Sequence, residues 1–187
     1  MKIGVLAVQG AFIEHENVLS SLGVESFEIR QKKDLENACD GLILPGGEST
    51  VMGKLLNELD LMKGIQEKIK SGMPVLGTCA GLILLADEIC DEDNRYIGTM
   101  PVKVRRNAYG RQLGSFQHVG NVKGVGEIPM TFIRAPYIEK CGDEVEVLSK
   151  VDERIVAARY RNQLGISFHP EVTHDTRMHK YFLEMIK

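Results

Sequence analysis

The chain has 187 residues and a formal net charge of −3, with 43% hydrophobic and 26% charged residues. A chain of this size buries about 70% of its unfolded surface, so we expect one self-sufficient domain over residues 1–187. The small net charge gives no electrostatic basis for binding nucleic acid or an anionic membrane, and neither partner is expected.

The cysteine pattern indicates free thiols and not a disulfide framework or a zinc site. The four cysteines, Cys39, Cys79, Cys90 and Cys141, are widely scattered, with no C-x-x-C pair and no histidine at zinc-finger spacing. No metal or other cofactor is therefore expected. Scattered thiols suit a reducing compartment, the N-terminal apolar run is too short for a signal peptide, and no stretch has the ~18 apolar residues of a membrane span. The predicted location is the cytoplasm.

The N-terminal half alternates β-like runs with helical spacing. Strands are predicted at residues 2–8, 26–30 and 41–44, and helices at residues 13–22, 34–38, 51–56 and 61–69. Several of these strands are apolar on both faces, which is typical of a parallel sheet covered by helices on both sides. The predicted fold class is therefore α/β, a three-layer, flavodoxin-like, mostly parallel sheet.

The C-terminal half changes character and indicates antiparallel strands added to that sheet. Short β-like runs separated by Gly, Asn and Asp turns occupy residues 100–106, 112–122, 130–135, 145–151, 155–160 and 165–168. Residues 87–95 are expected to form a solvated loop. Residues 178–186 are predicted to close the chain as an amphipathic helix, capped by Asp175 or Thr176.

Cys79 lies at the sharpest predicted turn of the chain. Val75 and Leu76 belong to a strand, an apolar helical segment follows, and Gly77 and Gly81 flank the cysteine two residues away on either side. A side chain at either glycine would collide with neighbouring backbone, and the cysteine would be strained with its sulfur outward. The helix N-terminus beneath it favours thiolate over thiol. This pattern predicts a nucleophile, and the alternative is a buried structural cysteine in a βα turn.

A glycine pair follows the predicted strand at residues 41–44. Gly46 and Gly47 fall at the carboxyl edge of the sheet, where open α/β folds bind ligands. Their exposed N–H groups could receive an oxyanion, with Ser49 or Thr50 as the cap of the next helix. The stretch lacks the spacing and the lysine of a phosphate loop, and a plain βα turn is the alternative.

His169 and Glu171 supply the other groups of a candidate catalytic set. Because Pro170 holds the preceding residue extended, and side chains two apart in an extended chain share a face, Glu171 is expected beside the imidazole of His169. The carboxylate can fix the imidazole tautomer and leave the other ring nitrogen for a nucleophile. Cys79, His169 and Glu171 are therefore predicted to be nucleophile, base and orienter. A surface turn at a strand end is the alternative.

The remaining histidines are assigned no role. His15, His118, His174 and His179 have no adjacent partner of the required kind. We expect them at the surface or at helix ends.

Three stretches together resemble the class I (triad) glutamine amidotransferases: residues 45–50 (PGGEST), 77–81 (GTCAG) and 168–171 (FHPE). More narrowly, residues 4–10 (GVLAVQG), 42–50 (LILPGGEST), 106–112 (RNAYGRQ) and 132–136 (FIRAP) are similar to the glutaminase subunits of pyridoxal 5'-phosphate synthases. The resemblance covers essentially the whole chain and implies a single class I glutamine amidotransferase-like domain over residues 1–187. Gln117 departs from it, since this family is expected to have glutamate there.

The resemblance implies hydrolysis of L-glutamine to L-glutamate and ammonia through a thioester on Cys79. Backbone N–H groups of Gly47 and Ala80 would hold the oxyanion, while His169 would first protonate the departing ammonia and then activate water. One arginine would pair with the α-carboxylate of the substrate. The positions that match glutamine-binding residues of the family are Gly47, Glu48, Ser49, Arg106, Ile133 and Arg134.

The resemblance also implies a partner, a synthase subunit that docks in a hetero-oligomeric complex and uses the ammonia to make pyridoxal 5'-phosphate (vitamin B6). Glutaminase activity is expected to be low until docking, with the Gly46–Gly47 peptide flipping as the switch. Two alternatives remain open. One is a triad glutaminase that serves another biosynthetic synthase, and the other is a non-enzymatic regulatory protein on the same fold.

Overall fold

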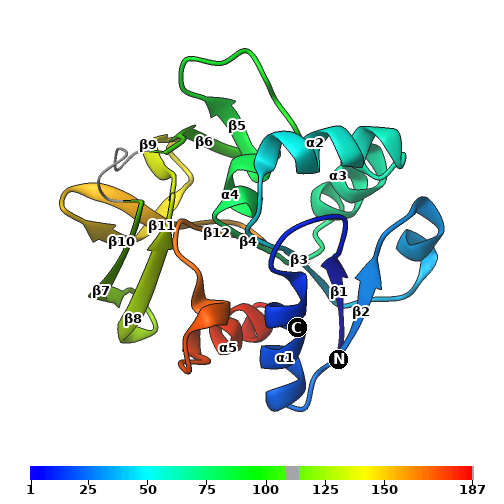
Figure 1. The fold of residues 1–187 in the computed structure, drawn as a ribbon, viewed down its shortest axis with the longest axis horizontal. Coiled ribbons are helices and arrows are strands. Elements are labelled where there is room, and N and C mark those ends of the chain that lie inside the picture. The colour runs from blue at the N-terminus through cyan, green and yellow to red at the C-terminus, as the bar shows by residue number, and fades with distance from the viewer. Residues whose placement is uncertain (108–113, 187) are drawn as a thin grey trace.

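The computed structural model describes residues 1–107 and 114–186, and these residues form a ten-stranded sheet (Figure 1). Its parallel part, in spatial order, consists of β2 (Glu25–Ile29), β1 (Lys2–Leu6), β3 (Gly41–Leu44), β4 (Val75–Thr78) and β12 (Gln163–Ile166). This order is that of a flavodoxin-like sheet. Every residue of β3, β4 and β12 is buried, which confirms the prediction of a parallel sheet covered on both faces.

Beyond β12 the sheet continues mainly through antiparallel strands. These are β11 (Arg154–Tyr160), β10 (Glu146–Val151), β9 (Tyr137–Cys141), β6 (Met100–Arg105) and the edge strand β5 (Ala86–Ile89), which pairs with β6 in parallel. The added antiparallel strands were predicted, but β5 and β9 were not. The prediction of a solvated loop over residues 87–95 is wrong at its start, because Ala86 and Ile89 are buried ends of a strand whose middle residues are polar.

Two of the β-like runs form a separate hairpin that lies outside the large sheet. It consists of β7 (Ser115–Val122) and β8 (Gly126–Ile133), which pair with each other over eight residues. Residues 112–113 of the first predicted run lie outside the described residues. Val122, Ile128, Met130 and Phe132 of the hairpin are buried in the core beside β12, so the hairpin is packed onto one face of the sheet.

Helices cover the two faces of the sheet in two groups (Figure 1). The first group is α1 (Phe12–Ser21) and α5 (Arg177–Glu184), and the second is α2 (Ser49–Glu58), α3 (Met62–Lys70) and the short α4 (Ala80–Leu85). Alternate strand residues divide between the two cores: Ile43 packs with α1 and α5, whereas Leu42 and Leu44 pack with α2 to α4. The chain also forms two short 3-10 turns, η1 (Lys32–Glu36) and η3 (Pro170–Val172).

The start of α2 differs from the prediction. Ser49 is its first residue and Glu48 is its N-cap, with the carboxylate accepting hydrogen bonds from the N–H groups of Thr50 (3.1 Å) and Val51 (2.8 Å). The expectation that Ser49 or Thr50 would cap this helix is therefore wrong. Glu48 takes the role because its longer side chain curls back over the first turn, where a negative charge also suits the helix dipole.

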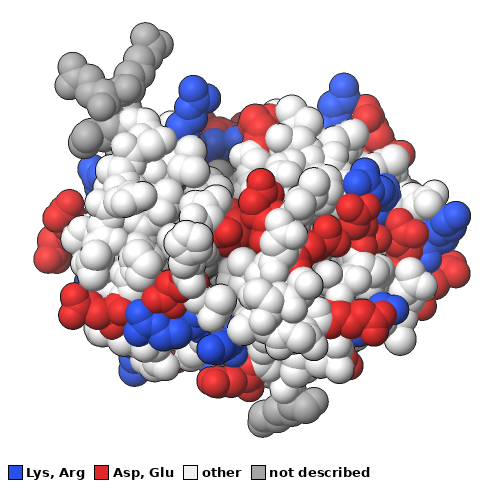
Figure 2. Space-filling view, turned by 60° about the horizontal axis from the view of Figure 1, so that its bottom comes forward, with Lys and Arg blue, Asp and Glu red and all other residues white. Residues whose placement is uncertain are grey.

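The surface carries charges of both signs. On the face shown in Figure 2, acidic and basic side chains are interspersed among uncharged ones. Within residues 1–107 and 114–186, no helix combines the length and the apolar character that crossing a membrane requires.

Candidate active site

Cys79 joins β4 to α4 in a conformation that few residues adopt. Its φ is 49° and its ψ is −101°, a region that costs a side-chain-bearing residue about 1–3 kcal/mol. The surrounding backbone leaves little room to relax. A Cβ on Gly81 would lie 2.0 Å from the carbonyl oxygen of Leu44, and one on Gly77 would lie 2.8 Å from the backbone of Gly81. The predicted strain at the cysteine and the predicted need for both glycines are confirmed.

The sulfur of Cys79 faces a cavity of about 440 Å³ at the carboxyl edge of the sheet. The residue is only 6% exposed, and its Sγ lies 3.8 Å from the carbonyl oxygen of Ile133 at the end of β8. The cavity brings together most of the predicted site residues. Its lining includes Gln9, Gly46, Gly47, Glu48, Ser49, Cys79, Arg106, Ile133, Arg134 and His169.

His169 follows β12 and is paired with Glu171. Its Nδ1 lies 2.6 Å from Oε1 of Glu171, and its backbone N–H donates to the carbonyl oxygen of Thr131 on the hairpin at 2.8 Å. His169 itself is non-helical, with φ −108° and ψ 89°. Glu171, however, lies in the 3-10 turn η3, so the expectation of a continuing extended chain is wrong. The predicted contact between Glu171 and His169 is nevertheless present, because the 3-10 turn brings the carboxylate back to the imidazole ring.

The electrostatic surroundings keep His169 protonated. Burial alone would lower its pKa, but its interactions with Cys79 and with the hydrogen-bonded carboxylate of Glu171 raise the pKa to about 10. Because Glu171 occupies Nδ1, Nε2 is the ring nitrogen left for the sulfur. The arrangement is thus suited to a thiolate–imidazolium pair held in place by a buried carboxylate.

The glycine pair lies directly against this histidine. A Cβ on Gly46 would lie 2.3 Å from Cε1 of His169, and one on Gly47 would lie 2.4 Å from Oε1 of Gln9. The carbonyl oxygen of Gly46 accepts a hydrogen bond from the N–H of Ala11 at 2.9 Å. Ala80 is the first residue of α4, so its N–H has no partner within the helix. The N–H of Ala80 is therefore available beside Cys79, whereas the Gly46–Gly47 peptide is held with its carbonyl oxygen toward Ala11.

Arg106 is tied into the wall of the cavity. Its Nη1 donates to the hydroxyl groups of Ser49 (2.7 Å) and Thr50 (3.1 Å), and its Nη2 donates to the hydroxyl of Tyr96 (3.0 Å). Its Nε lies 2.9 Å from Oε1 of Glu92, an ion pair without hydrogen-bond geometry. Ser49 and Arg106, both predicted to bind glutamine, are thus joined to each other by a hydrogen bond. Residues 108–112 of the same motif lie outside the described residues.

Arg134 differs from Arg106 in its surroundings. It follows β8 with a positive φ of 45°, is exposed, and its backbone N–H donates to the carbonyl oxygen of Gly114 at 2.6 Å. No side chain of the described part of the chain forms a hydrogen bond or ion pair with its guanidinium. The cavity therefore has one arginine held in its wall and one whose charge no described side chain neutralises.

Two histidines that the sequence placed at the surface are fully buried. His15 on α1 and His179 on α5 are 0% exposed, so the expectation for them is wrong. A signal was present, because His15 lies four residues before the buried Leu19, and His179 lies three residues before the buried Phe182. At these spacings a residue shares the core-facing side of its helix.

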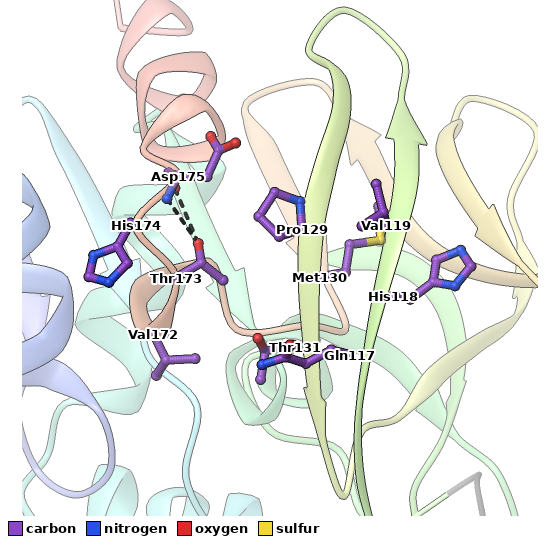
Figure 3. Close-up of a pocket in the computed structure, with 10 residues that line it drawn as sticks. All are labelled: Gln117, His118, Val119, Pro129, Met130, Thr131, Val172, Thr173, His174 and Asp175. Atoms are coloured by element: carbon purple, nitrogen blue, oxygen red, sulfur yellow. Dashed lines mark hydrogen bonds between the residues drawn. The ribbon is translucent and has the colours of Figure 1, made fainter.

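His118 and His174 are exposed, as expected. They lie at a second hollow of about 760 Å³ between the β7–β8 hairpin and the segment after Glu171. In Figure 3 they project to opposite sides, so the hollow does not bring them together. Gln117, the one departure from the family pattern, lines this hollow and not the Cys79 cavity. The departure therefore does not fall on a residue that lines the Cys79 cavity.

Comparison with known proteins agrees with this geometry. The chain matches the SNO glutamine amidotransferase family over residues 5–187. It is 59% identical over 186 residues to the pyridoxal 5'-phosphate synthase subunit PdxT of Desulfitobacterium hafniense, covering 100% of this chain and 94% of the relative. It is 57% identical over 190 residues to the subunit of the same name from Streptococcus pneumoniae, covering 100% and 98%.

Among solved structures, the chain is similar to a crystal structure of a glutamine amidotransferase with a TM-score of 0.93 and 44% identity, covering 98% of both chains. The α/β fold described above is thus the fold of a glutamine amidotransferase. More narrowly, the chain belongs to the SNO glutamine amidotransferase family.

The raised pKa of His169 predicts how stability depends on pH. A histidine whose pKa rises from 6.5 to about 10 on folding adds stability that is fully present below the lower value and is lost as the pH rises through the upper one. We therefore expect the difference in free energy of unfolding between the wild type and His169→Ala to shrink as the pH rises from about 7 to about 10. Urea unfolding across this range measures the difference.

His174→Ala, which removes an exposed histidine, is the control for general effects of pH. A difference between wild type and His169→Ala that stays constant over the range would contradict a protonated His169.

Proposed function

We propose that this chain hydrolyses L-glutamine to L-glutamate and ammonia and supplies the ammonia to the synthase subunit of a pyridoxal 5'-phosphate synthase. The observation that carries the proposal is a strained Cys79 sharing a cavity with a His169 that is paired with Glu171. The relatives named PdxT support the choice of synthase. We take residues 1–187 to work as one domain in the cytoplasm, and the four free cysteines favour such a reducing compartment.

The first half of the reaction forms a thioester. The Cys79 thiolate attacks the side-chain carbonyl carbon of glutamine, and the N–H groups of Gly47 and Ala80 hold the resulting oxyanion. Protonated His169 gives its proton to the amide nitrogen, the C–N bond breaks, and ammonia leaves. The raised pKa of His169 suits this step, because the imidazole must carry a proton when the thiolate attacks.

The second half regenerates the enzyme. Neutral His169, still oriented by Glu171 through the 2.6 Å contact, takes a proton from water while the water oxygen attacks the thioester carbon. The second oxyanion collapses, the C–S bond breaks, and glutamate leaves with its side chain as a carboxylate. Cys79 returns to the thiolate and His169 to the protonated form, and the new carboxyl group releases its one remaining proton to water or to the departing ammonia, which becomes ammonium.

Recognition of the amino-acid end of glutamine is assigned to the remaining lining residues. Arg134 is exposed, and its guanidinium has no partner among the described residues, so we propose that it pairs with the α-carboxylate of the substrate. Arg106 acts differently, because its Nη atoms already donate to Ser49, Thr50 and Tyr96. It shapes the wall together with Ser49. Gly47, Glu48 and Ile133 complete the glutamine site.

Docking of the synthase subunit is proposed to switch the site on. The hydrogen bond from Ala11 to the carbonyl oxygen of Gly46 fixes the Gly46–Gly47 peptide in one orientation. Because N–H and C=O point to opposite sides of a planar peptide, a flip would redirect the N–H of Gly47. One backbone hydrogen bond contributes only about 0.5–1.5 kcal/mol, so the partner's contacts can offset its loss.

We predict that the purified chain releases glutamate much faster when its synthase subunit is present. Cys79→Ala and His169→Ala should lower the rate by a factor of about 1,000 or more, since they remove the nucleophile and the proton carrier, while the complex still forms. Glutamate release is measured with and without the synthase, and complex formation by co-purification. Cys141→Ala, which removes a half-buried thiol on β9, is the matched control and should keep the wild-type rate.

Each contrary outcome has its own meaning. Equal release with and without the synthase would rule out the switch, and failure of the variants to dock would indicate a structural role for these residues. No glutamate under any condition would favour the non-enzymatic alternative. Docking on a synthase for another product would point to the other alternative, a different ammonia acceptor.

We predict that Arg134→Gln raises the KM for glutamine about tenfold or more and changes kcat by less than about threefold. A hydrogen bond to a charged group contributes about 1.5–3 kcal/mol, and contacts to the amino-acid end bind ground state and transition state alike. Arg106→Gln is the comparison, and it should lower both kcat and stability because Arg106 ties α2 to Tyr96. An unchanged KM in Arg134→Gln would contradict the assignment.

A further inference from the structure

The second oxygen of Glu171 has no hydrogen-bond partner within the described chain. Its side chain is wholly buried, Oε1 pairs with His169, and Oε2 is left without a donor. The polar atom found beside it is Nε2 of His15, at 3.6 Å, which is an electrostatic contact and too long for a hydrogen bond. A buried carboxylate oxygen without a nearby donor is unfavourable. His15 is thus placed where it can influence the orientation of Glu171.

His15 is itself held from two sides. Its Nε2 lies 3.2 Å from the hydroxyl oxygen of Thr78, and its Nδ1 lies 2.9 Å from Nε2 of His179. His15, Thr78 and His179 are all 0% exposed and come from α1, β4 and α5. Because Thr78 immediately precedes Cys79, His15 links the strand that carries the nucleophile to the carboxylate that orients its base.

Burial decides the protonation of both histidines. It lowers the pKa of His15 well below its usual value, with the neighbouring His179 and His169 adding to the effect, and it lowers the pKa of His179 to about 4. Each ring is therefore neutral at physiological pH and carries a single N–H. Neither ring competes with His169 as a second cation beside Glu171.

One arrangement of these two hydrogens suits all the contacts. The carboxylate of Glu171 can only accept, so the hydrogen of His15 belongs on Nε2, which faces both Glu171 and Thr78. Nδ1 of His15 must then accept from the Nε2–H of His179. This leaves Nδ1 of His179 as a bare lone pair, and that atom has no partner among the described residues. A buried acceptor without a partner is tolerated better than a buried donor.

We propose that His15, with its tautomer set by His179, is a positioning residue for glutamine hydrolysis: its Nε2–H side faces Oε2 of Glu171 and keeps the carboxylate turned so that Oε1 meets His169. The proposal rests on the proposed roles of His169 and Glu171. His15 touches neither the substrate cavity nor the reacting atoms. It acts only through Glu171, so its effect should appear in kcat and not in KM.

Two amide substitutions separate the two sides of the His15 ring. In His15→Gln the amide nitrogen reaches the place of Nε2, whereas in His15→Asn the amide reaches only the place of Nδ1. With the chain bound to its synthase subunit, we expect His15→Gln to keep kcat within about threefold of wild type and His15→Asn to lower it about tenfold, the scale seen when outer partners of ligating histidines are removed. The KM for glutamine should stay unchanged in both.

The decisive measurement repeats the substitution in a Glu171→Ala background. If His15 acts through the carboxylate, His15→Asn should not lower the residual kcat of Glu171→Ala any further. Leu19→Val, one turn along α1 and equally buried, is the control that disturbs packing without removing a polar group, and it should leave kcat unchanged. If His15→Asn does not fold, His179→Leu replaces it. We expect His179→Leu to lower kcat about threefold in the wild-type background and not to lower it further in the Glu171→Ala background.

Equal kcat values for His15→Asn and His15→Gln would overturn the proposal, and so would an equal fold-loss in the wild-type and Glu171→Ala backgrounds. Failure of the proposed function itself would look different, because the wild-type complex would then release no glutamate.

Discussion

The close packing of α4 against the ends of β3 and β4 is the constraint on which the site depends. Because Gly81 sits directly on the carbonyl of Leu44, the chain must turn abruptly, and Cys79 takes a positive φ at the turn. The N–H of Cys79 donates to the carbonyl oxygen of Ile166 at 2.8 Å, so the turn is also tied to the neighbouring strand β12. His169 leaves that strand three residues later. Strand order therefore brings Cys79 and His169 to one site. Their strands, β4 and β12, are far apart in the sequence and become neighbours only when the sheet forms.

The parallel sheet and the β7–β8 hairpin supply different residues of the site. The sheet supplies Cys79 and His169 from adjacent strand ends. The hairpin supplies the opposite wall, where Thr131 accepts from the N–H of His169 and the carbonyl of Ile133 faces the sulfur. The nucleophile and its base thus belong to the parallel sheet, while Arg134, whose guanidinium has no partner among the described residues, follows the hairpin. A related protein could change what it recognises without moving the nucleophile or its base.

The features that can be predicted from the sequence are those that a local residue pattern determines. Apolar runs identify the parallel strands, and glycine spacing identifies the turn at Cys79. The edge strand β5 is missed because its middle residues are polar, and the cap of α2 is misplaced because the length of the Glu48 side chain decides it. The pairing of His169 with Glu171 is right although the assumed extended backbone is not. For His15 and His179 the helical spacing indicates burial but not their contact: they are 164 residues apart, and only the packing of α1 beside α5 brings them together behind Glu171.

Of the four thiols, Cys79 alone is poised to attack a glutamine amide. Burial and Glu139 raise the pKa of Cys90 to about 11, and burial also raises the pKa of Cys39 and Cys141, so these three form an internal control. The most direct measurement is treatment of the synthase complex with an electrophilic glutamine analogue, followed by peptide mapping. We predict a covalent adduct on Cys79 only, suppressed by excess glutamine and absent in His169→Ala. Adducts on the other cysteines, or none on Cys79 while glutamine is being hydrolysed, would contradict it.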